Sequence, residues 1–491
     1  MKDLIQYISE NKNTNPNKVF LKTSAGDFSY KEIALKINNL SCNLYKPLYK
    51  QRHIGILIDD SIEFILSFLA IQKNSDIAVL LPVKMDPEIL IQKINSLNLS
   101  VIIYHEKYRS VIQKSGVNAT RIVIGEALSD EENFQNLLQQ PQSFEYRIPF
   151  LNIENPALII FTSGSMGIPK NILLSHKNLL HNSLACQKII QNTKNLNYIG
   201  YPDFTNFISL ILVLGLAVTT NGSITIPDNK SDDTILKIIK EKKVNVFVSV
   251  PKNLKNLLDH SDKGNLSVTD YTLSVGENLD ENFVEMWTYK FNSTLMLGYG
   301  LAESLIVSFN LKNDSFKPAS MGKPLADCEM KIMNAMQVEL PIGHTGELHI
   351  KSTANLISYY NSEKNKNFQN KWVATGDLVK KDFDGYYHYV DKKSNIIHRN
   401  GFIIFPTEIE KIIGRHPKIK QIHVLKLLGE KDDNIKFCVV AEDSDLTVKE
   451  VKDYAKENLP LFLHPDFIEI YNEFPEDPLG KILRHKFIHS H

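Results

Sequence analysis

Short apolar runs alternate with amphipathic helical patterns through the first two-thirds of the chain, and this alternation constrains the fold more than any other feature. Residues 52–59 (RHIGILID) are typical of a short buried strand, and Ser61 can cap the helical pattern that follows. The repeated strand–helix order predicts largely parallel sheets with helices on their faces. The same strand pattern recurs at residues 76–81, 101–104, 156–162, 223–226 and 244–250.

Beyond about residue 320 the pattern changes to short, turn-bounded β segments, for example at residues 347–350 and 386–390. A helix is expected to start after Pro406, and residues 447–458 predict another. We therefore expect an α/β fold with a large N-terminal body and a small C-terminal α+β domain. The body, residues 1–393, would contain βαβ-type sheets flanked by helices and a small β-barrel-like part, and the small domain would span residues 394–491.

The charge and composition of the chain exclude several classes of protein. Lys and Arg number 56, as do Asp and Glu, so there is no basic excess of the kind that nucleic acid or an anionic membrane attracts. The 43% hydrophobic content suits a sizeable core, and four widely spaced cysteines predict buried thiols rather than a metal or redox site. The longest apolar run, residues 207–218, is shorter than the ~20 residues that span a bilayer. With no signal-peptide pattern at the start, we expect a cytoplasmic protein without a membrane span or a nucleic-acid partner.

Residues 161–170 (FTSGSMGIPK) carry the strongest chemical signal. They follow a strand pattern and precede residues 172–179, which read as the start of a helix. Their glycines and hydroxylated residues supply donors that can surround polyphosphate oxygens, and Lys170 adds a positive charge. The segment is not a Walker A loop, because no Gly-Lys-Ser/Thr follows its glycines, and Ser163 stands where a G-x-S-x-G nucleophile elbow requires glycine. On these residues alone, an ordinary Gly/Ser turn explains the segment as well.

This loop resembles the phosphate-binding motif of the adenylate-forming enzymes, the superfamily of acyl-CoA synthetases, peptide-synthetase adenylation domains and luciferases. Their pattern is Y/F-T-S-G-S/T-T-G-x-P-K-G, from which the chain departs at Met166 and Asn171. Neither departure removes the backbone donors or Lys170. The resemblance implies nucleotide contacts from Thr162, Ser163, Gly164, Ser165, Gly167 and Lys170.

Further segments are similar to the family's motifs and follow in the family's order, so the resemblance covers essentially the whole chain. Residues 274–279 (SVGENL) resemble the segment that borders the acyl pocket and the adenine, and residues 298–303 (GYGLAE) resemble Y-G-x-T-E. The resemblance implies that Tyr299 stacks on adenine and that Glu303 helps to hold Mg²⁺ at the phosphates. It also implies that Val275 and Gly298, together with Thr205 of residues 201–207, border the acid pocket. The nucleotide contacts that it implies here are those of Gly276, Glu277, Gly300 and Ala302.

The C-terminal third contributes three more expected contacts. Asp377, in residues 375–377 (TGD), would accept hydrogen bonds from both ribose hydroxyls. Residues 391–401 (DKKSNIIHRNG) are the weakest match, because Lys392 replaces an arginine that reaches the ribose and Ser394 stands at the hinge, where Asp or Lys is usual. Residues 475–484 (PEDPLGKILR) resemble the closing motif, which implies that Lys481, on a mobile lid that rotates about Ser394, bridges the substrate carboxylate and the α-phosphate.

The resemblance implies two half-reactions, in which a carboxylic acid reacts with Mg·ATP and the acyl-adenylate then passes its acyl group to a pantetheine thiol. That thiol belongs either to CoA or to the phosphopantetheine of an acyl or peptidyl carrier protein. Aligning Phe204 with the family's aromatic residue places Thr205 where amino-acid-activating relatives carry Asp or His. Asp203, which is next to Phe204, is expected to point away from the acid, because strand alternation reverses neighbouring side chains. We therefore expect an aryl or aliphatic acid without an α-amino group.

Other functions stay open at this point. A stand-alone amino-acid-adenylating enzyme of the peptide-synthetase type is one alternative. Another is a catalytically degenerate relative that binds nucleotide or acyl-adenylate without turnover, because Ala302 replaces the usual threonine and the hinge motif is weak. Retention of Lys170, Glu303, Asp377 and Lys481 argues against degeneracy. The Y-G-L-A-E sequence also recurs in fatty acyl-AMP ligases that load carrier proteins, which tilts the expected acceptor slightly from CoA toward a carrier protein.

Overall fold

The computed structural model describes residues 2–46, 50–140, 152–162, 170–190, 194–241, 243–260, 269–277, 279–311, 317–318, 320–361, 368–369, 372–429, 432–442, 445–475, 482 and 487. These residues form two compact units. The first comprises Met1–Gly164, Ile168–Glu329 and Lys351–Val373, and the second is built mainly from Met330–Ile350 and Ala374–His491. The predicted boundary at residues 393 and 394 stays a prediction.

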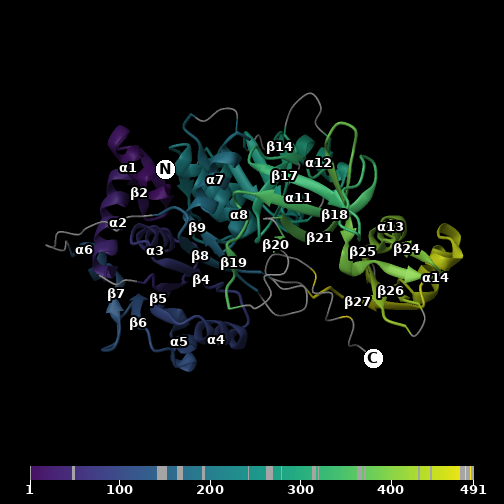
Figure 1. Ribbon diagram of the computed structural model, residues 1–491, viewed down its shortest axis with the longest axis horizontal. Coiled ribbons are helices and arrows are strands. Elements are labelled where there is room, and N and C mark those ends of the chain that lie inside the picture. The colour runs from purple at the N-terminus through teal and green to yellow at the C-terminus, as the bar shows by residue number, and fades with distance from the viewer. Residues whose placement is uncertain are drawn as a thin grey trace. The chain divides into compact units, whose positions relative to one another are not determined.

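The first unit contains an eight-stranded sheet with the order β19-β9-β8-β4-β3-β5-β6-β7 (Figure 1). Neighbours from β8 to β7 are parallel, whereas β8–β9 and β9–β19 are antiparallel. The strands are β3 (His53–Leu57), β4 (Ile77–Leu80), β5 (Leu99–His105), β6 (Thr120–Ile124), β7 (Glu132–Asn133), β8 (Pro156–Phe161), β9 (Asn171–Ser175) and β19 (Ser358–Tyr359). The parallel strands predicted from the apolar runs are thus confirmed.

Side-chain alternation along these strands explains why helices cover both faces of the sheet. Ile54 and Ile56 pack into one apolar cluster with Phe64 of α3 (Ile62–Lys73), whereas Ile102 packs into another with Ile94 of α4 (Pro87–Ser96). Figure 1 shows α3 on one side of these strands, and α4 with α5 (Arg109–Ser115) on the other. The predicted cap of α3 is confirmed, because the Ser61 hydroxyl accepts from the Phe64 N–H at 3.4 Å.

The prediction of a helix from residue 172 is wrong. Residues Asn171–Ser175 form β9, which pairs antiparallel with β8, and helix α7 (His176–Gln187) begins only after Ser175. Ser175 and Asn178 form the capping box of α7. The apolar residues before that cap satisfy their backbone groups in the sheet ladder, a pairing that the local pattern did not reveal.

A nine-stranded sheet, also in the first unit, has the order β16-β15-β14-β13-β12-β10-β11-β1-β2. Along this order, each strand from β14 to β1 is parallel to the next. At the two ends of the sheet, β2 pairs antiparallel with β1, β15 with β14, and β16 with β15. The strands are β1 (Val19–Thr23), β2 (Gly26–Ser29), β10 (Asn197–Gly200), β11 (Ser223–Thr225), β12 (Val246–Ser249), β13 (Tyr271–Val275), β14 (Thr294–Leu301), β15 (Leu305–Phe309) and β16 (Lys323–Pro324).

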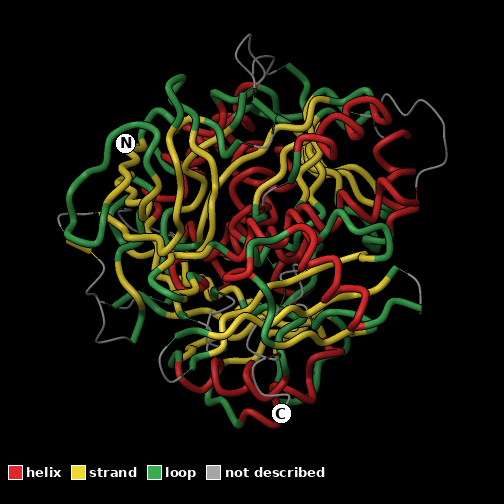
Figure 2. Tube along the Cα trace, turned by 90° about the vertical axis from the view of Figure 1, so that its right-hand side faces the viewer, coloured by secondary structure: helices red, strands yellow, loops and turns green. Residues whose placement is uncertain are grey.

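The first unit contains further helices, and Figure 2 shows the helices of the chain in red and its strands in yellow. The further helices are α1 (Leu4–Thr14), α2 (Tyr30–Leu44), α6 (Phe134–Gln139), α8 (Phe207–Ser209), α9 (Leu216–Thr219), α10 (Asp232–Glu241), α11 (Pro251–His260) and α12 (Glu281–Phe291), with a 3₁₀ turn at Glu106–Tyr108. The buried helix predicted at residues 207–218 is confirmed as α8, a π-helical turn at Leu210–Gly215 and α9. Among the described helices, none has the length and apolarity needed to cross a membrane.

The β segments expected after residue 320 form a five-stranded sheet in which β17, β18, β21 and β20 follow one another and β22 also pairs with β21. The strands are β17 (Cys328–Met333), β18 (Thr345–Ser352), β20 (Phe368–Gln369), β21 (Trp372–Lys381) and β22 (Tyr387–Lys392). A 3₁₀ turn at Lys393–Asn395 follows β22. This sheet presents Asp377 and Lys392, two of the expected site residues, on neighbouring strands.

The C-terminal α+β segment has its own three-stranded sheet, in which β25 and β26 are antiparallel and β26 and β27 are parallel. Pro406 is the first residue of α13, and Thr447 caps α14, so both predicted helices are confirmed. Of the closing motif at residues 475–484, the structure describes only Pro475 and Ile482. The elements are β23 (Ile397–Arg399), β24 (Phe402–Ile404), α13 (Pro406–Ile413), β25 (Ile419–Leu427), β26 (Asn434–Ala441), α14 (Val448–Asn458), a 3₁₀ turn (Leu461–Leu463) and β27 (Phe467–Tyr471).

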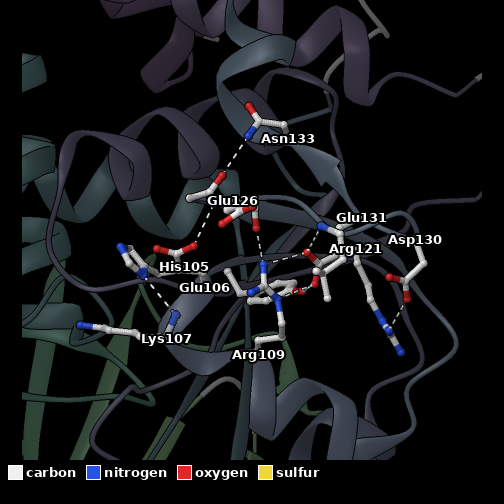
Figure 3. A network of polar contacts seen from close by, with 12 residues as sticks. His105, Glu106, Lys107, Arg109, Arg121, Glu126, Asp130, Glu131 and Asn133 are labelled. Atoms are coloured by element: carbon white, nitrogen blue, oxygen red, sulfur yellow. Dashed lines mark hydrogen bonds and ion pairs between the residues drawn. The ribbon is translucent and has the colours of Figure 1, made fainter.

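A network of charged side chains ties together the segments that follow β5 and β6 (Figure 3). Arg109 donates to both carboxylate oxygens of Glu131 at 3.0 Å, and the Leu128 N–H donates to Glu131 at 2.9 Å. The Tyr104 hydroxyl also donates to Glu131. These bonds hold the pKa of Glu131 at about 2, although burial alone would raise it. The network therefore stabilises this end of the sheet with an ionised, nearly buried carboxylate.

Candidate functional site

The two ends of the predicted phosphate loop are joined by hydrogen bonds. The Thr162 N–H donates to the Lys170 carbonyl at 3.1 Å, and the Lys170 N–H donates to the Thr162 hydroxyl at 3.2 Å. The loop therefore leaves β8 and enters β9 as the connection of an antiparallel pair. Ser163, Gly164, Ser165 and Gly167 lie outside the described residues.

A lysine that the sequence analysis missed contacts the base of this loop. Lys93 Nζ on α4 donates to Asn171 Oδ1 at 2.8 Å and lies 5.6 Å from the centre of the Phe161 ring. Burial lowers the pKa of Lys93. The side chain of Asn171, where the family has glycine, is thus used in a contact with a distant helix.

Tyr359 connects two of the predicted site residues, Lys170 and Glu303. Its hydroxyl donates to Glu303 Oε1 at 3.0 Å, and Lys170 Nζ lies 5.0 Å from the centre of its ring. Burial, together with the charge of Glu303 and its hydrogen bond, raises the pKa of Tyr359 well above its ordinary value. Lys170, the cation at the end of the predicted phosphate loop, and Glu303, the expected magnesium ligand, therefore both contact Tyr359.

Glu303 lies in the turn between β14 and β15, and the GYGL part of the GYGLAE segment forms the end of β14. β14 approaches β15 so closely that a Cβ at Gly298 would meet the Phe309 ring at 2.7 Å, and one at Gly300 would meet the Leu305 carbonyl at 2.5 Å. Both glycines are therefore required by packing. Tyr299 lies between them in β14, and the pairing with β15 is irregular between Tyr299 and Gly300.

The neighbouring strand β13 ends at the other predicted segment. Val275 is buried at the end of β13 and pairs with Gly298, so the two expected pocket residues lie side by side. Gly276 and the exposed Glu277 follow directly in the bend after β13. Ala302 is buried in the turn after β14.

The segment expected to border the acid pocket, residues 201–207, is held by buried charges. Lys230 Nζ donates to the carbonyls of Tyr201 and Pro202 at 2.9 and 3.0 Å, and to Asp60 Oδ2 at 2.5 Å. The Phe204 N–H donates to Asp60 Oδ1 at 2.7 Å. Burial raises the pKa of Asp60, and the positive charge of Lys230 acts in the opposite direction. Neither Asp60 nor Lys230 was picked out from the sequence, because they lie far from this segment along the chain.

Asp203 in the same segment is paired with two lysines. Its Oδ1 lies 3.3 Å from Lys230 Nζ and its Oδ2 lies 3.0 Å from Lys84 Nζ. Burial alone would raise the pKa of Asp203, but the two lysines lower it below the usual value. Thr205, two residues on, is half-buried and carries no charge.

In the second unit, Asp377 and Lys392 are neighbours across β21 and β22, and Lys392 Nζ lies 3.7 Å from Asp377 Oδ1. The Thr375 hydroxyl accepts from the Asp377 N–H at 3.1 Å and donates to the Leu348 carbonyl at 2.9 Å. These contacts set the position of the TGD segment. A lysine beside Asp377 keeps the positive charge that the family places here as arginine.

Ser394, the expected hinge residue, lies in the 3₁₀ turn Lys393–Asn395. Asp391, fully buried, accepts from the Lys392 N–H at 2.7 Å and from Asn395 Nδ2 at 2.9 Å, and its other oxygen accepts from the Thr407 N–H at 3.1 Å. Asp391 therefore fastens the turn around Ser394 to the start of α13. Lys481 lies outside the described residues.

The described residues contain no group of three or more His, Cys, Asp or Glu side chains arranged to hold a metal ion by themselves. Glu303 supplies a single carboxylate. Mg²⁺ is commonly held by one or two carboxylates together with substrate phosphates and water, so a lone Glu303 fits a magnesium ion that arrives with a nucleotide. None of the four cysteines forms a disulfide; Cys186 and Cys438 are buried, as expected, whereas Cys42 and Cys328 are only partly buried.

Comparison with known proteins gives a consistent result. A family model described as AMP-binding enzyme matches residues 8–360, and one described as AMP-binding enzyme C-terminal domain matches residues 408–481. A long-chain-fatty-acid–CoA ligase of Escherichia coli O6:H1 is 26% identical over 374 residues, which cover 74% of this chain and 67% of that protein. A crotonobetaine/carnitine–CoA ligase of Salmonella arizonae is 25% identical over 484 residues, covering 93% of this chain and 92% of that protein.

The fold is also that of a solved structure. The crystal structure of the anthranilate CoA ligase AuaEII in complex with anthranoyl-AMP has a TM-score of 0.87 and 21% identity, covering 99% of this chain and 96% of that chain. The first family model spans more than half of the chain, and the motifs of the phosphate loop, the GYGLAE turn and the TGD strand fall in the order that the sequence analysis expected. The chain therefore belongs to the AMP-binding enzyme family, within the adenylate-forming superfamily of AMP-forming acid–thiol ligases.

Proposed function

We propose that this enzyme activates an aryl or aliphatic carboxylic acid with Mg·ATP and transfers the acyl group to the thiol of CoA. The observation that carries the proposal is the convergence of Lys170 and Glu303 on Tyr359, which gathers a cation and a carboxylate where a triphosphate and its magnesium would need them. The CoA ligases among the relatives support CoA as the acceptor over the carrier protein. The carrier protein is kept as the second acceptor to be tested.

In the first half-reaction, a carboxylate oxygen of the acid forms a bond to the α-phosphorus. The bond between that phosphorus and the bridging oxygen breaks, and pyrophosphate leaves with the electron pair. Lys170 would neutralise phosphate charge, and Glu303 would hold the magnesium ion, which screens the negative charges of the phosphates. Lys481 would bridge the carboxylate and the α-phosphate, and Asp377 with Lys392 would bind the ribose.

In the second half-reaction, the sulfur of the CoA thiol attacks the carbonyl carbon of the acyl-adenylate. The carbon–oxygen bond to the phosphate breaks, AMP leaves with the electron pair, and the thiol proton passes to solvent. Rotation of the C-terminal domain about Ser394 would withdraw Lys481 and admit the thiol. The contacts of Asp391 around Ser394 support a defined turning point at this position.

The charges around residues 201–207 support an acid without an α-amino group. A substrate ammonium requires a carboxylate partner, and Asp203 already pairs with Lys230 and Lys84. Thr205 offers a hydroxyl but no charge. This arrangement disfavours the amino-acid-activating alternative.

Pyrophosphate exchange into ATP, measured with a panel of aryl, fatty and amino acids, tests the proposal. Exchange with aryl or fatty acids is the expected result, and acids that support it are then offered CoA and a phosphopantetheinylated carrier protein in turn. Exchange with amino acids alone would favour the peptide-synthetase alternative. ATP binding without exchange for any acid would favour the degenerate relative.

A further inference from the structure

Tyr359 occupies a position that the backbone fixes from two sides. The Ile357 N–H donates to the Leu173 carbonyl at 2.8 Å and the Tyr360 N–H donates to the Asn171 carbonyl at 2.9 Å, so β19 is fastened to β9. The Leu356 N–H donates to the Glu303 carbonyl at 2.8 Å. The short segment that carries Tyr359 is therefore bound both to the strand that follows Lys170 and to the backbone of Glu303.

The side chain of Tyr359 repeats this double attachment. Its hydroxyl donates to Glu303 Oε1 at 3.0 Å, while the Lys170 ammonium lies 5.0 Å from the centre of its ring, within the range of a cation–π contact. The ring itself is buried in the main apolar cluster of the first unit. A buried ring cannot turn away freely, so the hydroxyl and the ring face hold a constant relationship to Glu303 and Lys170.

We propose that Tyr359 is a positioning residue that orients the Glu303 carboxylate toward the magnesium of Mg·ATP and restrains Lys170 beside the same phosphates. This role rests on the proposed function. The hydrogen bond to Oε1 fixes the rotation of the carboxylate, so that binding a cation costs little further ordering of Glu303. The ring face limits the positions that the long Lys170 side chain can take.

Two substitutions separate the hydroxyl from the ring. Tyr359→Phe removes the bond to Glu303 and keeps the aromatic face, whereas Tyr359→Leu removes both. Tyr360→Phe is the matched control, because it makes the same change one residue further along, where the ring contacts His53 edge-on at 5.0 Å. Glu303→Gln, alone and combined with Tyr359→Phe, reports whether the hydroxyl acts through Glu303.

The measurement is binding of a non-hydrolysable ATP analogue by calorimetry, with and without Mg²⁺, supported by the thermal shift that each produces. We expect Tyr359→Phe to raise, by roughly tenfold, the Mg²⁺ concentration at which the enhancement of analogue binding is half-maximal. Loss of a hydrogen-bond partner of a metal-binding carboxylate typically weakens metal binding by about this factor. Metal-free affinity should stay within about twofold of wild type, since the ring remains beside Lys170. Tyr359→Leu should weaken metal-free binding as well, and Tyr360→Phe should match wild type.

Three results would overturn this role. In the first, Tyr359→Phe responds to Mg²⁺ as Tyr360→Phe does. In the second, Tyr359→Phe weakens binding equally with and without Mg²⁺, which a general structural defect would produce. In the third, the double variant Glu303→Gln with Tyr359→Phe shows a smaller enhancement of analogue binding by Mg²⁺ than Glu303→Gln alone. A wild-type protein that binds no analogue under any condition would instead overturn the proposed function, and this role with it.

Discussion

Lys230 Nζ and Asp60 Oδ2 lie 2.5 Å apart, although the two residues are 170 positions apart in the chain. Both side chains are largely buried, at 16% and 10% exposure, and together they bind the backbone of Tyr201, Pro202 and Phe204. The segment that contains Thr205 is thus held by an ion pair formed from two other parts of the sequence.

Replacing Lys230 with Met should loosen this segment. Because the change leaves Asp60 buried without its main counter-charge, we expect unfolding free energy to fall by roughly 3 kcal/mol. The KM for the carboxylic acid should rise about tenfold or more, while the KM for ATP changes little, since the segment faces the acid pocket in our proposal. Steady-state kinetics with each substrate varied checks this split.

Lys84→Met is the matched control for Lys230→Met, because Lys84 also pairs with Asp203 but is 56% exposed. It should change unfolding free energy by less than about 0.5 kcal/mol. Equal increases in both KM values for Lys230→Met would contradict a specific link to the acid pocket.

Lys481→Ala should slow adenylation by about a hundredfold or more, because the transition state loses a positive charge at the α-phosphate. Thioester formation from supplied acyl-AMP should be spared, because that step does not use the lysine in our proposal. The two half-reactions are measured separately, by pyrophosphate exchange and by CoA consumption. Lys452→Ala, an exposed change on α14, serves as the control. Equal loss of both steps would remove the role assigned to Lys481.

Glu131 in the network of Figure 3 should make stability depend on acid pH. Its pKa in the folded protein is about 2, below the usual carboxyl value of 4.5, so its contribution is present above about pH 4.5 and is lost as pH falls toward 2. Glu131→Gln should cost roughly 2 kcal/mol at pH 7, and the difference from wild type should shrink as pH falls from about 4.5 toward 2. Thermal unfolding at several pH values measures this, with exposed Glu132→Gln as the control. A difference that does not change with pH would contradict the assignment.

His176, at the start of α7, should act in a different pH window. Burial lowers its pKa from 6.5 to about 4, so protonation favours the unfolded chain as pH falls from 6.5 to 4. Across this window, the free energy of unfolding of the wild type should fall by up to about 3 kcal/mol more than that of His176→Gln. The comparison uses denaturant unfolding at pH 7 and pH 4.5, with His181→Gln on the same helix as the control. Parallel pH profiles for wild type and His176→Gln would disprove this effect.

Local sequence signals predicted the elements well where capping and alternation decide them. Ser61 caps the helix at which it was placed, the helix expected at residues 447–458 is α14, and Pro406 starts α13. The strand patterns were also correct, because residues buried on both faces of a parallel sheet leave a continuous apolar run. The helix predicted from residue 172 was wrong for a related reason, since an apolar run before a cap fits either a strand or a helix until its pairing partner is known.

The candidate site residues came from sequence motifs, and the residues that hold them in place did not. Lys170, Glu303 and Asp377 were identified because each belongs to a short motif, whereas Tyr359, Asp60 and Lys230 belong to none that the sequence revealed. Tyr359 gains its contacts only because β19 pairs with β9. The strand alternation expected at Asp203 is wrong, because β10 (Asn197–Gly200) ends before it and residues 201–206 contain no strand; the orientation of Asp203 away from the acid pocket stays a prediction.

The sequence by itself determined the family, the order of the motifs and the alternation of strands and helices, since these depend on residues close together in the chain. Tertiary structure alone decided which distant side chains are in contact. Lys170 and Glu303 both contact Tyr359, and Lys230 pairs with Asp60 at residues 201–207. The physical reason is that hydrogen bonds and ion pairs act over a few ångströms, and strand pairing brings residues within that range wherever they lie in the sequence.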